Sequence, residues 1–152
     1  MIKRIEYRQG DMLANPQAGV YLAHACNTKG AWGPYIAQQF KQRWPKAFNY
    51  YKEYCAQGRA KTGDVLIVAE HSSYPIICLF TSTGYGRYAD SPEQILESTK
   101  SALSNLLFDE DVEIHSPKIN SGKFRVPWEQ TEALIEEYLE KNPHIKWVVW
   151  EL

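Results

Sequence analysis

Short apolar runs alternate along the chain with segments of helical periodicity, and this alternation limits the fold more than any other feature. Residues 20–25 and 74–81 are nearly continuous apolar runs, as in strands that are buried on both faces. Further strands are predicted at 2–9, 64–69, 112–119 and 145–150. Strands that alternate with helices favour an α/β domain with a mostly parallel sheet, covered by helices on both faces.

Proline marks the start of each predicted helix. The clearest start combines Ser91 as the N-cap, Pro92 at the first helical position and Gln94 as the partner in a capping box. Apolar residues then recur at helical spacing as far as Leu107. The other three helices are expected to begin at Pro34, Pro45 and Pro127.

Composition excludes several classes of protein. The 152 residues suit one domain spanning 1–152, and a net charge of −1 argues against a broad basic surface for nucleic acid. No apolar run reaches the roughly 18 residues of a membrane span, and the charged start is unlike a signal peptide. The three cysteines and four histidines form no CxxC or HExxH motif, so we expect reduced thiols, no bound metal and no cofactor.

Three polar, glycine-containing loops follow predicted strands, at 27–33, 82–86 and 120–124. In open α/β sheets, ligands bind beyond the carboxyl ends of the strands. Backbone amides in such loops and at helix N-termini hold anions, above all phosphate. The alternative is that these glycines and serines only form turns. Neither a P-loop nor a dinucleotide-binding fingerprint occurs in any of them.

Four tracts of the chain, in order, resemble the macrodomain family, which binds ADP-ribose. They are Gly10–Met12, His24-x-Cys26-Asn27-x-x-Gly30-x-Trp32-Gly33, Leu79–Ser82 and Ile119-Asn120-Ser121-Gly122-x-Phe124-x-Val126-Pro127-Trp128. The last three are most similar to the fungal-type ADP-ribose-1″-phosphate phosphatases. The resemblance implies a three-layer α/β/α fold with a mixed, mostly parallel central sheet. It also implies metal-independent removal of the 1″-phosphate, processing of a tRNA-splicing by-product, and a cytoplasmic or nuclear location.

The resemblance also implies a ligand map. Asp11 would accept a hydrogen bond from the adenine amino group, with Met12 beside it, although an Asx-turn is the alternative for Asp11. Asn27 would contact the distal ribose, and Phe124 would lie over it. Backbone amides of two loops would hold the diphosphate, namely those of Ser82, Thr83, Gly84, Tyr85 and Gly86 and those of Ser121, Gly122, Lys123 and Phe124. Asn120, which precedes the second set, is also predicted to bind the ligand.

Two departures from the family pattern affect this map. The usual run of three glycines reads Gly33-Pro34-Tyr35 here, so Gly33 and Tyr35 are expected near the distal ribose but with altered contacts. Arg125 replaces another usual glycine, where it would narrow the pocket or reach a phosphate.

Catalysis is predicted at His24 and Asn27. His24 would handle protons at the 1″-phosphate or orient the attacking water, and its alternative is a satisfied histidine in the core. Lys29 and Arg87 are interpreted as solvated surface residues. Tyr35, Tyr85 and Phe124 are the aromatic residues expected at the ligand, and the others are expected to pack the core.

Two other functions stay open at this stage. One is a non-catalytic reader of ADP-ribose or of ADP-ribosylated protein, and the other is a hydrolase of ADP-ribosyl esters. The deacylating branch of the family uses a lysine in the second loop and an aspartate in the third, and this chain has neither there. We expect a monomer whose partner is ADP-ribose or ADP-ribose-1″-phosphate.

Overall fold

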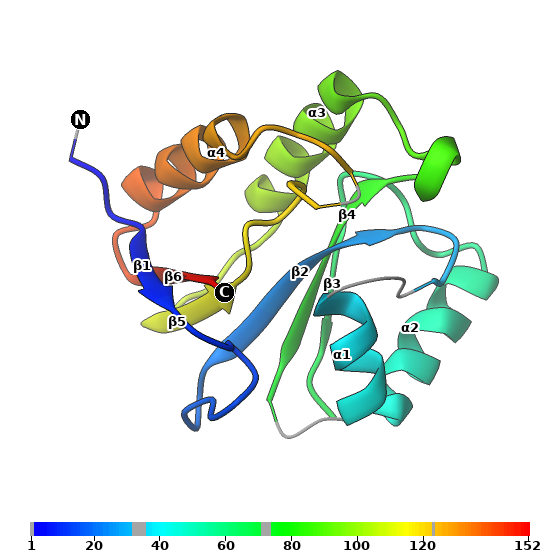
Figure 1. Cartoon of the computed structure of the whole chain (residues 1–152), viewed down its shortest axis with the longest axis horizontal. Coiled ribbons are helices and arrows are strands. Elements are labelled where there is room, and N and C mark those ends of the chain that lie inside the picture. The colour runs from blue at the N-terminus through cyan, green and yellow to red at the C-terminus, as the bar shows by residue number, and fades with distance from the viewer. Residues whose placement is uncertain (1, 32–35, 71–73, 123) are drawn as a thin grey trace.

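The computed structural model describes residues 2–31, 36–70, 74–122 and 124–152 (Figure 1). Within these ranges one sheet of six strands has the order β1-β6-β5-β2-β4-β3. The strands are β1 (Glu6–Gln9), β2 (Tyr21–Asn27), β3 (Val65–Val68), β4 (Ile76–Ser82), β5 (Val112–Ser116) and β6 (Ile145–Glu151). The helices are α1 (Ile36–Arg43), α2 (Pro45–Ala56), α3 (Pro92–Ser104) and α4 (Trp128–Lys141), with a short 3-10 turn η1 (Gly86–Tyr88).

The sheet is mixed and mostly parallel, as predicted. Strand β3 pairs with β4 in the antiparallel direction, and the other four pairings are parallel. The carboxyl ends of β1, β6, β5, β2 and β4 therefore lie at one edge of the sheet. The edge strands β1 and β3 have four residues each, which limits the unpaired backbone that the sheet exposes.

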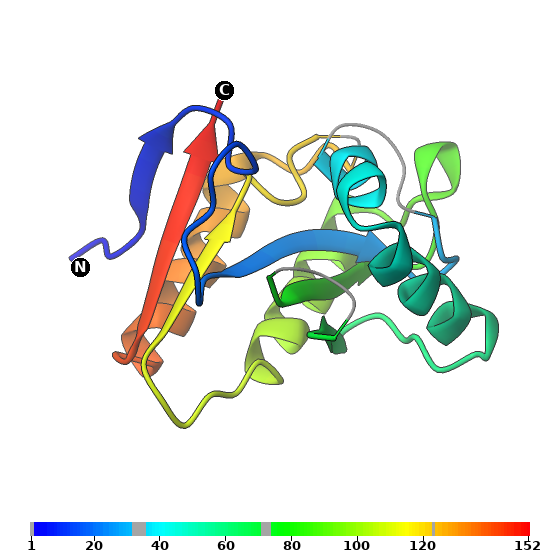
Figure 2. The same ribbon diagram turned by 90° about the horizontal axis from the view of Figure 1, so that it is seen from below.

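Helices cover both faces of the sheet, with α1 and α2 on one side and α3 and α4 on the other (Figures 1 and 2). Strand β4 shows how the two layers are filled, because all seven of its residues are buried. Ile77 and Leu79 belong to the core cluster that includes residues of α3 and α4, whereas Cys78 and Phe80 belong to the cluster beneath α1 and α2. This alternation confirms the three-layer α/β/α arrangement.

Local signals in the sequence are confirmed at the starts of α2 and α3. Helix α4 begins at Trp128, one residue after the predicted Pro127, and the start predicted at Pro34 lies outside the described residues. The Ser91 side chain accepts from the Gln94 backbone, and the Gln94 side chain accepts from the Ser91 backbone at 3.0 Å, which completes the predicted capping box. Pro45 occupies the first turn of α2. No helix in the described ranges is long and apolar enough to span a membrane.

Four predicted strands are shorter in the structure, and two of them differ substantially from the prediction. The first begins at Glu6 rather than at residue 2, because the backbone amides of Arg4 and Ile5 donate to the Glu136 carboxylate instead of to a neighbouring strand. The strand predicted at 112–119 ends at Ser116, because Pro117 cannot donate to a strand ladder. The turn η1 was not predicted.

Candidate functional site

The loops after β2, β4 and β5 meet at the carboxyl edge of the sheet. Asn27 of β2 pairs with Ser82 of β4, and the amide of Thr28 donates to the Ser82 carbonyl at 3.1 Å. The Thr81 hydroxyl donates to Asn120 Oδ1 at 2.9 Å, which connects β4 to the loop that follows β5. Figure 1 shows that loop reaching the end of β4. The structure thus brings together the three loops that the sequence singled out.

The loop after β4 is held in shape by its own side chains. Ser82 Oγ donates to the Gly84 carbonyl at 2.8 Å and accepts from the Asp90 amide at 3.0 Å. Asp90 Oδ2 in turn accepts from the Thr83 amide at 3.1 Å. A Cβ at Gly84 would lie 2.5 Å from the Tyr88 carbonyl oxygen, so only glycine fits there. Sequence reasoning missed Asp90, whose role depends on a contact with Thr83 across the loop.

Two of these loops present backbone N–H groups that are not used by the fold. The amides of Gly84 and Tyr85 make no hydrogen bond with any residue in the described part of the chain, nor do those of Gly122 and Phe124. Gly86 follows with a φ of 60°. Amides left unpaired on adjacent glycine-containing loops form the kind of concavity that binds phosphate oxygens. This arrangement suits the predicted diphosphate site.

Asn27 lies at the same edge, with its side chain bonded to its own loop. Its Nδ2 donates to the Ala31 carbonyl at 2.7 Å, and its Oδ1 accepts from the Lys29 amide at 2.9 Å. The Tyr51 hydroxyl donates to the Asn27 carbonyl at 2.6 Å and lies 3.3 Å from its Oδ1. Sequence reasoning expected only packing from Tyr51, whereas the structure makes it an anchor of the site. Contact between Asn27 and the distal ribose stays a prediction.

Asn120 faces the protein interior rather than the loop surface. It is buried, and its φ of 67° is in the left-handed region. Its Nδ2 donates to the Thr99 hydroxyl at 2.9 Å and lies 3.4 Å from the Thr131 hydroxyl. The Asn120 side chain is therefore engaged with the threonines and positions the loop, whereas contact between this residue and the ligand stays a prediction.

The His24 side chain is also buried in the interior. Its side chain faces α1, where its ring stacks on Phe40 at a centroid distance of 4.5 Å and an interplanar angle of 11°. The residue is 1% exposed, and its Nε2 lies 3.5 Å from Cys26 Sγ. The predicted handling of protons at a phosphate requires access to the loop surface, and this burial supports the alternative, a core histidine. Burial raises the pKa of Cys78, but hydrogen bonds with Cys26 and His24 outweigh it and lower that pKa to about 6.

Asp11 and Met12 follow β1 at the same edge of the sheet. Asp11 Oδ1 accepts from the Leu13 amide at 2.9 Å, so the Asx-turn that was the alternative for this residue is present. Met12 is buried in the apolar cluster beneath α1 and α2. Its side chain therefore packs the core, and recognition of adenine by Asp11 stays a prediction.

The remaining predicted residues divide into exposed side chains and positions that are not described. Tyr85 is 54% exposed, and Phe124 is half-buried. Lys29 and Arg87 are exposed, and the Arg87 guanidinium lies over the Tyr88 ring at 5.0 Å. The predictions for Gly33, Tyr35 and Lys123 lie outside the described residues.

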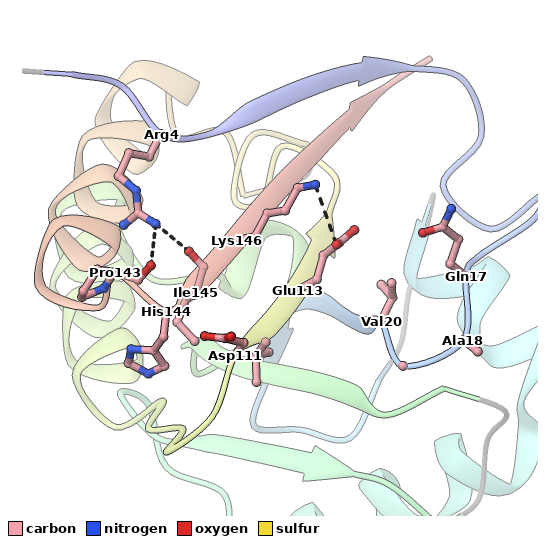
Figure 3. A pocket seen from close by; sticks show the side chains of 12 residues that line it. Arg4, Gln17, Ala18, Val20, Asp111, Glu113, Pro143, His144, Ile145 and Lys146 are labelled. Carbon is pink, nitrogen blue, oxygen red and sulfur yellow. Dashed lines mark hydrogen bonds and ion pairs between the residues drawn. The ribbon is translucent and has the colours of Figure 1, made fainter.

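A separate hollow of about 490 Å³ lies at the opposite edge of the sheet, near the amino ends of β2, β5 and β6 (Figure 3). Arg4 lines it and donates to the carbonyls of Pro143 and Ile145 at 3.1 and 2.9 Å. Lys146 Nζ lies 3.8 Å from a Glu113 carboxylate oxygen. Because these charges are already paired, this hollow is less suited to an anion than the loops at the carboxyl edge.

Fold and site together define a class of protein, since an α/β/α sandwich presents loop amides at the carboxyl edge of a mixed sheet. The family model for the Macro domain matches residues 23–135, and the chain belongs to the macrodomain family.

Relatives and solved structures agree with this assignment. The protein named ADP-ribose 1″-phosphate phosphatase from Candida albicans is 38% identical over 149 residues, covering 88% of this chain and 93% of that protein. The protein of the same name from Meyerozyma guilliermondii is 31% identical over 166 residues, covering 90% and 95%. The macrodomain of Mycobacterium tuberculosis DarG matches in structure with a TM-score of 0.79 and 22% identity, covering 97% of each chain.

Proposed function

We propose that this chain is a phosphatase that converts ADP-ribose-1″-phosphate and water into ADP-ribose and inorganic phosphate. The observation that carries the proposal is a set of amides, at Gly84, Tyr85, Gly122 and Phe124, that have no hydrogen-bond partner among the described residues and lie on two loops at one edge of the sheet. Relatives that are 38% and 31% identical over most of the chain bear the name of this activity. The substrate carries a diphosphate and a phosphate monoester, and neutral N–H donors suit both.

Substrate binding and charge stabilisation follow from the loops. The amides after β4 and β5 would hold the diphosphate, which fixes the ribose-1″-phosphate relative to Asn27 and Phe124. Water attacks the phosphorus atom, the bond between phosphorus and the 1″-oxygen breaks, and that oxygen takes up a proton. Fixed N–H donors stabilise negative charge without rearrangement, so the proposal assigns most of the catalysis to positioning and electrostatics.

The direct test measures phosphate release by the purified chain from ADP-ribose-1″-phosphate, with and without a metal chelator. We expect release that is insensitive to the chelator. Binding of ADP-ribose without release would indicate the reader instead. Liberation of ADP-ribose from a modified glutamate side chain, without phosphatase activity, would indicate the ester hydrolase.

A substitution at Asn27 tests whether the phosphatase activity resides at the carboxyl edge of the sheet. Asn27→Asp places a negative charge beside the phosphates and removes the donor to Ala31, so we expect at least a tenfold loss of kcat/KM. Gln130→Ala, on the exposed side of α4, is the control and should keep full activity. A fully active Asn27→Asp protein would contradict the location of the site.

His24→Gln separates the two roles considered for that residue. Because His24 is buried against Phe40, we expect a lower Tm and a kcat close to that of the unaltered chain in the folded fraction. A folded His24→Gln protein that binds ADP-ribose normally but releases no phosphate would restore the proton-handling role.

The setting of the reaction is part of the proposal. A by-product of tRNA splicing is the proposed source of the substrate, and the cytoplasm or nucleus is the proposed location. Mass measurement in solution tests the expected monomer, and cell fractionation tests the location.

A further inference from the structure

Three side chains of the kind that bind metals gather inside the protein, on the face of the sheet beneath α1 and α2. They are His24 and Cys26 of β2 and Cys78 of β4. His24 and Cys26 are two residues apart on one strand, so both point to the same face. Cys78 pairs in register with His24 on the neighbouring strand. Sequence reasoning found no metal motif because this cluster forms across two strands.

The distances within the cluster suit a single ion. One ligand atom from each residue lies within 4.8 Å of the other two, and His24 Nε2 lies 3.5 Å from Cys26 Sγ. An ion bound at about 2.1 Å from nitrogen and 2.3 Å from sulfur holds these atoms about 3.6 Å apart in tetrahedral geometry. We propose that His24, Cys26 and Cys78 form a binding site for one thiophilic cation, Zn²⁺ or Cu⁺.

The chemistry of the donors selects the ion. Thiolate and imidazole ligands favour Zn²⁺ and Cu⁺, whereas Mg²⁺ and Ca²⁺ require oxygen ligands. All three residues are buried, and the stacked Phe40 ring fixes the His24 imidazole. Three protein ligands complete a three-coordinate Cu⁺ site, and a tetrahedral Zn²⁺ site would take one more ligand.

A disulfide between the two cysteines fits less well than a metal ion. Cys26 pairs with Phe80, two residues beyond Cys78 along β4, so the two cysteines are diagonal neighbours. With strands about 4.8 Å apart and a rise of about 3.3 Å per residue, such diagonal residues have Cα atoms about 8 Å apart, whereas disulfides usually need less than about 7 Å. A metal ion bridges the longer separation without a shift of either strand.

Metal binding is tested on the full chain, purified with a reductant and stripped with a chelator. Zn²⁺ and Cu⁺ are titrated in separate experiments, with a competing chromophoric chelator, and native mass spectrometry counts the bound ions. We expect one equivalent of at least one of the two ions, together with a higher Tm. Co²⁺, as a probe for the Zn²⁺ site, should show thiolate-to-metal charge-transfer absorption. Absence of stoichiometric binding by both ions would overturn the proposal.

Cysteine variants assign the ligands. Cys26→Ser and Cys78→Ser should each lose the stoichiometric binding, whereas Cys55→Ser should keep it, because Cys55 lies on α2 outside the cluster. Binding retained by both Cys26→Ser and Cys78→Ser would contradict the site. The cobalt spectrum of the unaltered chain decides the question even where a core variant fails to fold. None of these measurements uses ADP-ribose-1″-phosphate, so they stand apart from the phosphatase proposal.

Discussion

Asn120 joins three elements of the protein through one side chain. Its amide bonds to hydroxyls of Thr81 in β4, Thr99 in α3 and Thr131 in α4. Asn120→Ala leaves these buried hydroxyls without that partner, so we expect the free energy of unfolding to fall by about 2–3 kcal/mol. Urea denaturation measures this change. Gln130→Ala, an exposed change, should stay within about 0.5 kcal/mol, and a similar small effect at Asn120 would argue against its anchoring role.

Arg125 replaces the usual glycine and has a φ of 60°. A Cβ in this left-handed conformation costs roughly 1–2 kcal/mol, which glycine avoids. Comparison of Arg125→Gly with Arg125→Ala isolates the backbone, because both variants remove the same charge. We expect the glycine variant to be more stable than the alanine variant by about 1 kcal/mol in urea denaturation. Equal stability would show that the backbone relaxes when the arginine side chain is removed.

The Tyr51 hydroxyl connects α2 to the carboxyl end of β2 through its hydrogen bond to Asn27. Tyr51→Phe removes that bond and keeps the ring, so we expect a loss of about 1 kcal/mol in stability and a lower kcat/KM. Tyr54→Phe is a matched control, because both rings stack on Phe80 at 6.1 Å. Phosphate release and urea denaturation measure both variants. If the two behaved alike, Tyr51 would have no role beyond packing.

At the scale of elements, strands and helices could be predicted wherever their signals are local. The capping box at Ser91 and the apolar run of β4 are contained in a few neighbouring residues, and both were predicted. The start of β1 was wrong because it depends on Glu136, a partner far along the chain. Element boundaries that rest on such distant contacts leave no local pattern in the sequence.

The difference between local signals and distant contacts also explains which features of the site could be predicted. Three polar loops after strands could be predicted, because the carboxyl ends of parallel strands share an edge. The direction in which each side chain points could not be predicted, because it depends on neighbours from other elements. His24 stacks on Phe40 of α1, and Asn120 bonds to threonines of β4, α3 and α4. Both residues were predicted at the ligand and lie in the interior.

The loop between β4 and α3 depends on Asp90, which holds the Thr83 amide. Asp90→Ala frees that amide and the segment before Gly84, so we expect at least a tenfold fall in kcat/KM with a smaller change in kcat. Asp90→Asn keeps an oxygen that accepts from Thr83 and should recover most of the activity. Steady-state kinetics on ADP-ribose-1″-phosphate provide the measurement. Equal losses in both variants would assign a role to the charge of Asp90 rather than to its position.

At the scale of the whole molecule, the net charge of −1 agrees with the way in which the site is built. In the proposed function, backbone amides and loop geometry supply the anion-binding groups, and such a site does not need a surface with an excess of lysine and arginine. The aromatic residues fall into two groups, one in the core and one in the loops. Phe40, Tyr51 and Phe80 fill the layer beneath α1 and α2, whereas Tyr85 and Phe124 lie in the loops.

At the scale of the whole sheet, we expect stability to depend on pH through His115 of β5. Trp150 Nε1 donates to His115 Nδ1 at 3.0 Å, so the neutral imidazole carries its proton on Nε2, 2.6 Å from a Glu113 carboxylate oxygen. Burial lowers the pKa of His115, even though the hydrogen bond with Glu113 acts in the opposite direction. Protonation of Nδ1 would break the contact with Trp150.

The sign of the effect follows from this lowered pKa. Below the ordinary value of about 6.5, the unfolded chain binds a proton at His115 before the folded chain does. Stability is therefore level above that pH and falls as pH decreases toward the lower folded pKa. Urea denaturation at pH 7.5 and 5.5 should show a larger loss for the unaltered chain than for His115→Gln, which has no group to titrate. Equal losses would mean that other groups, rather than His115, set the response to acid.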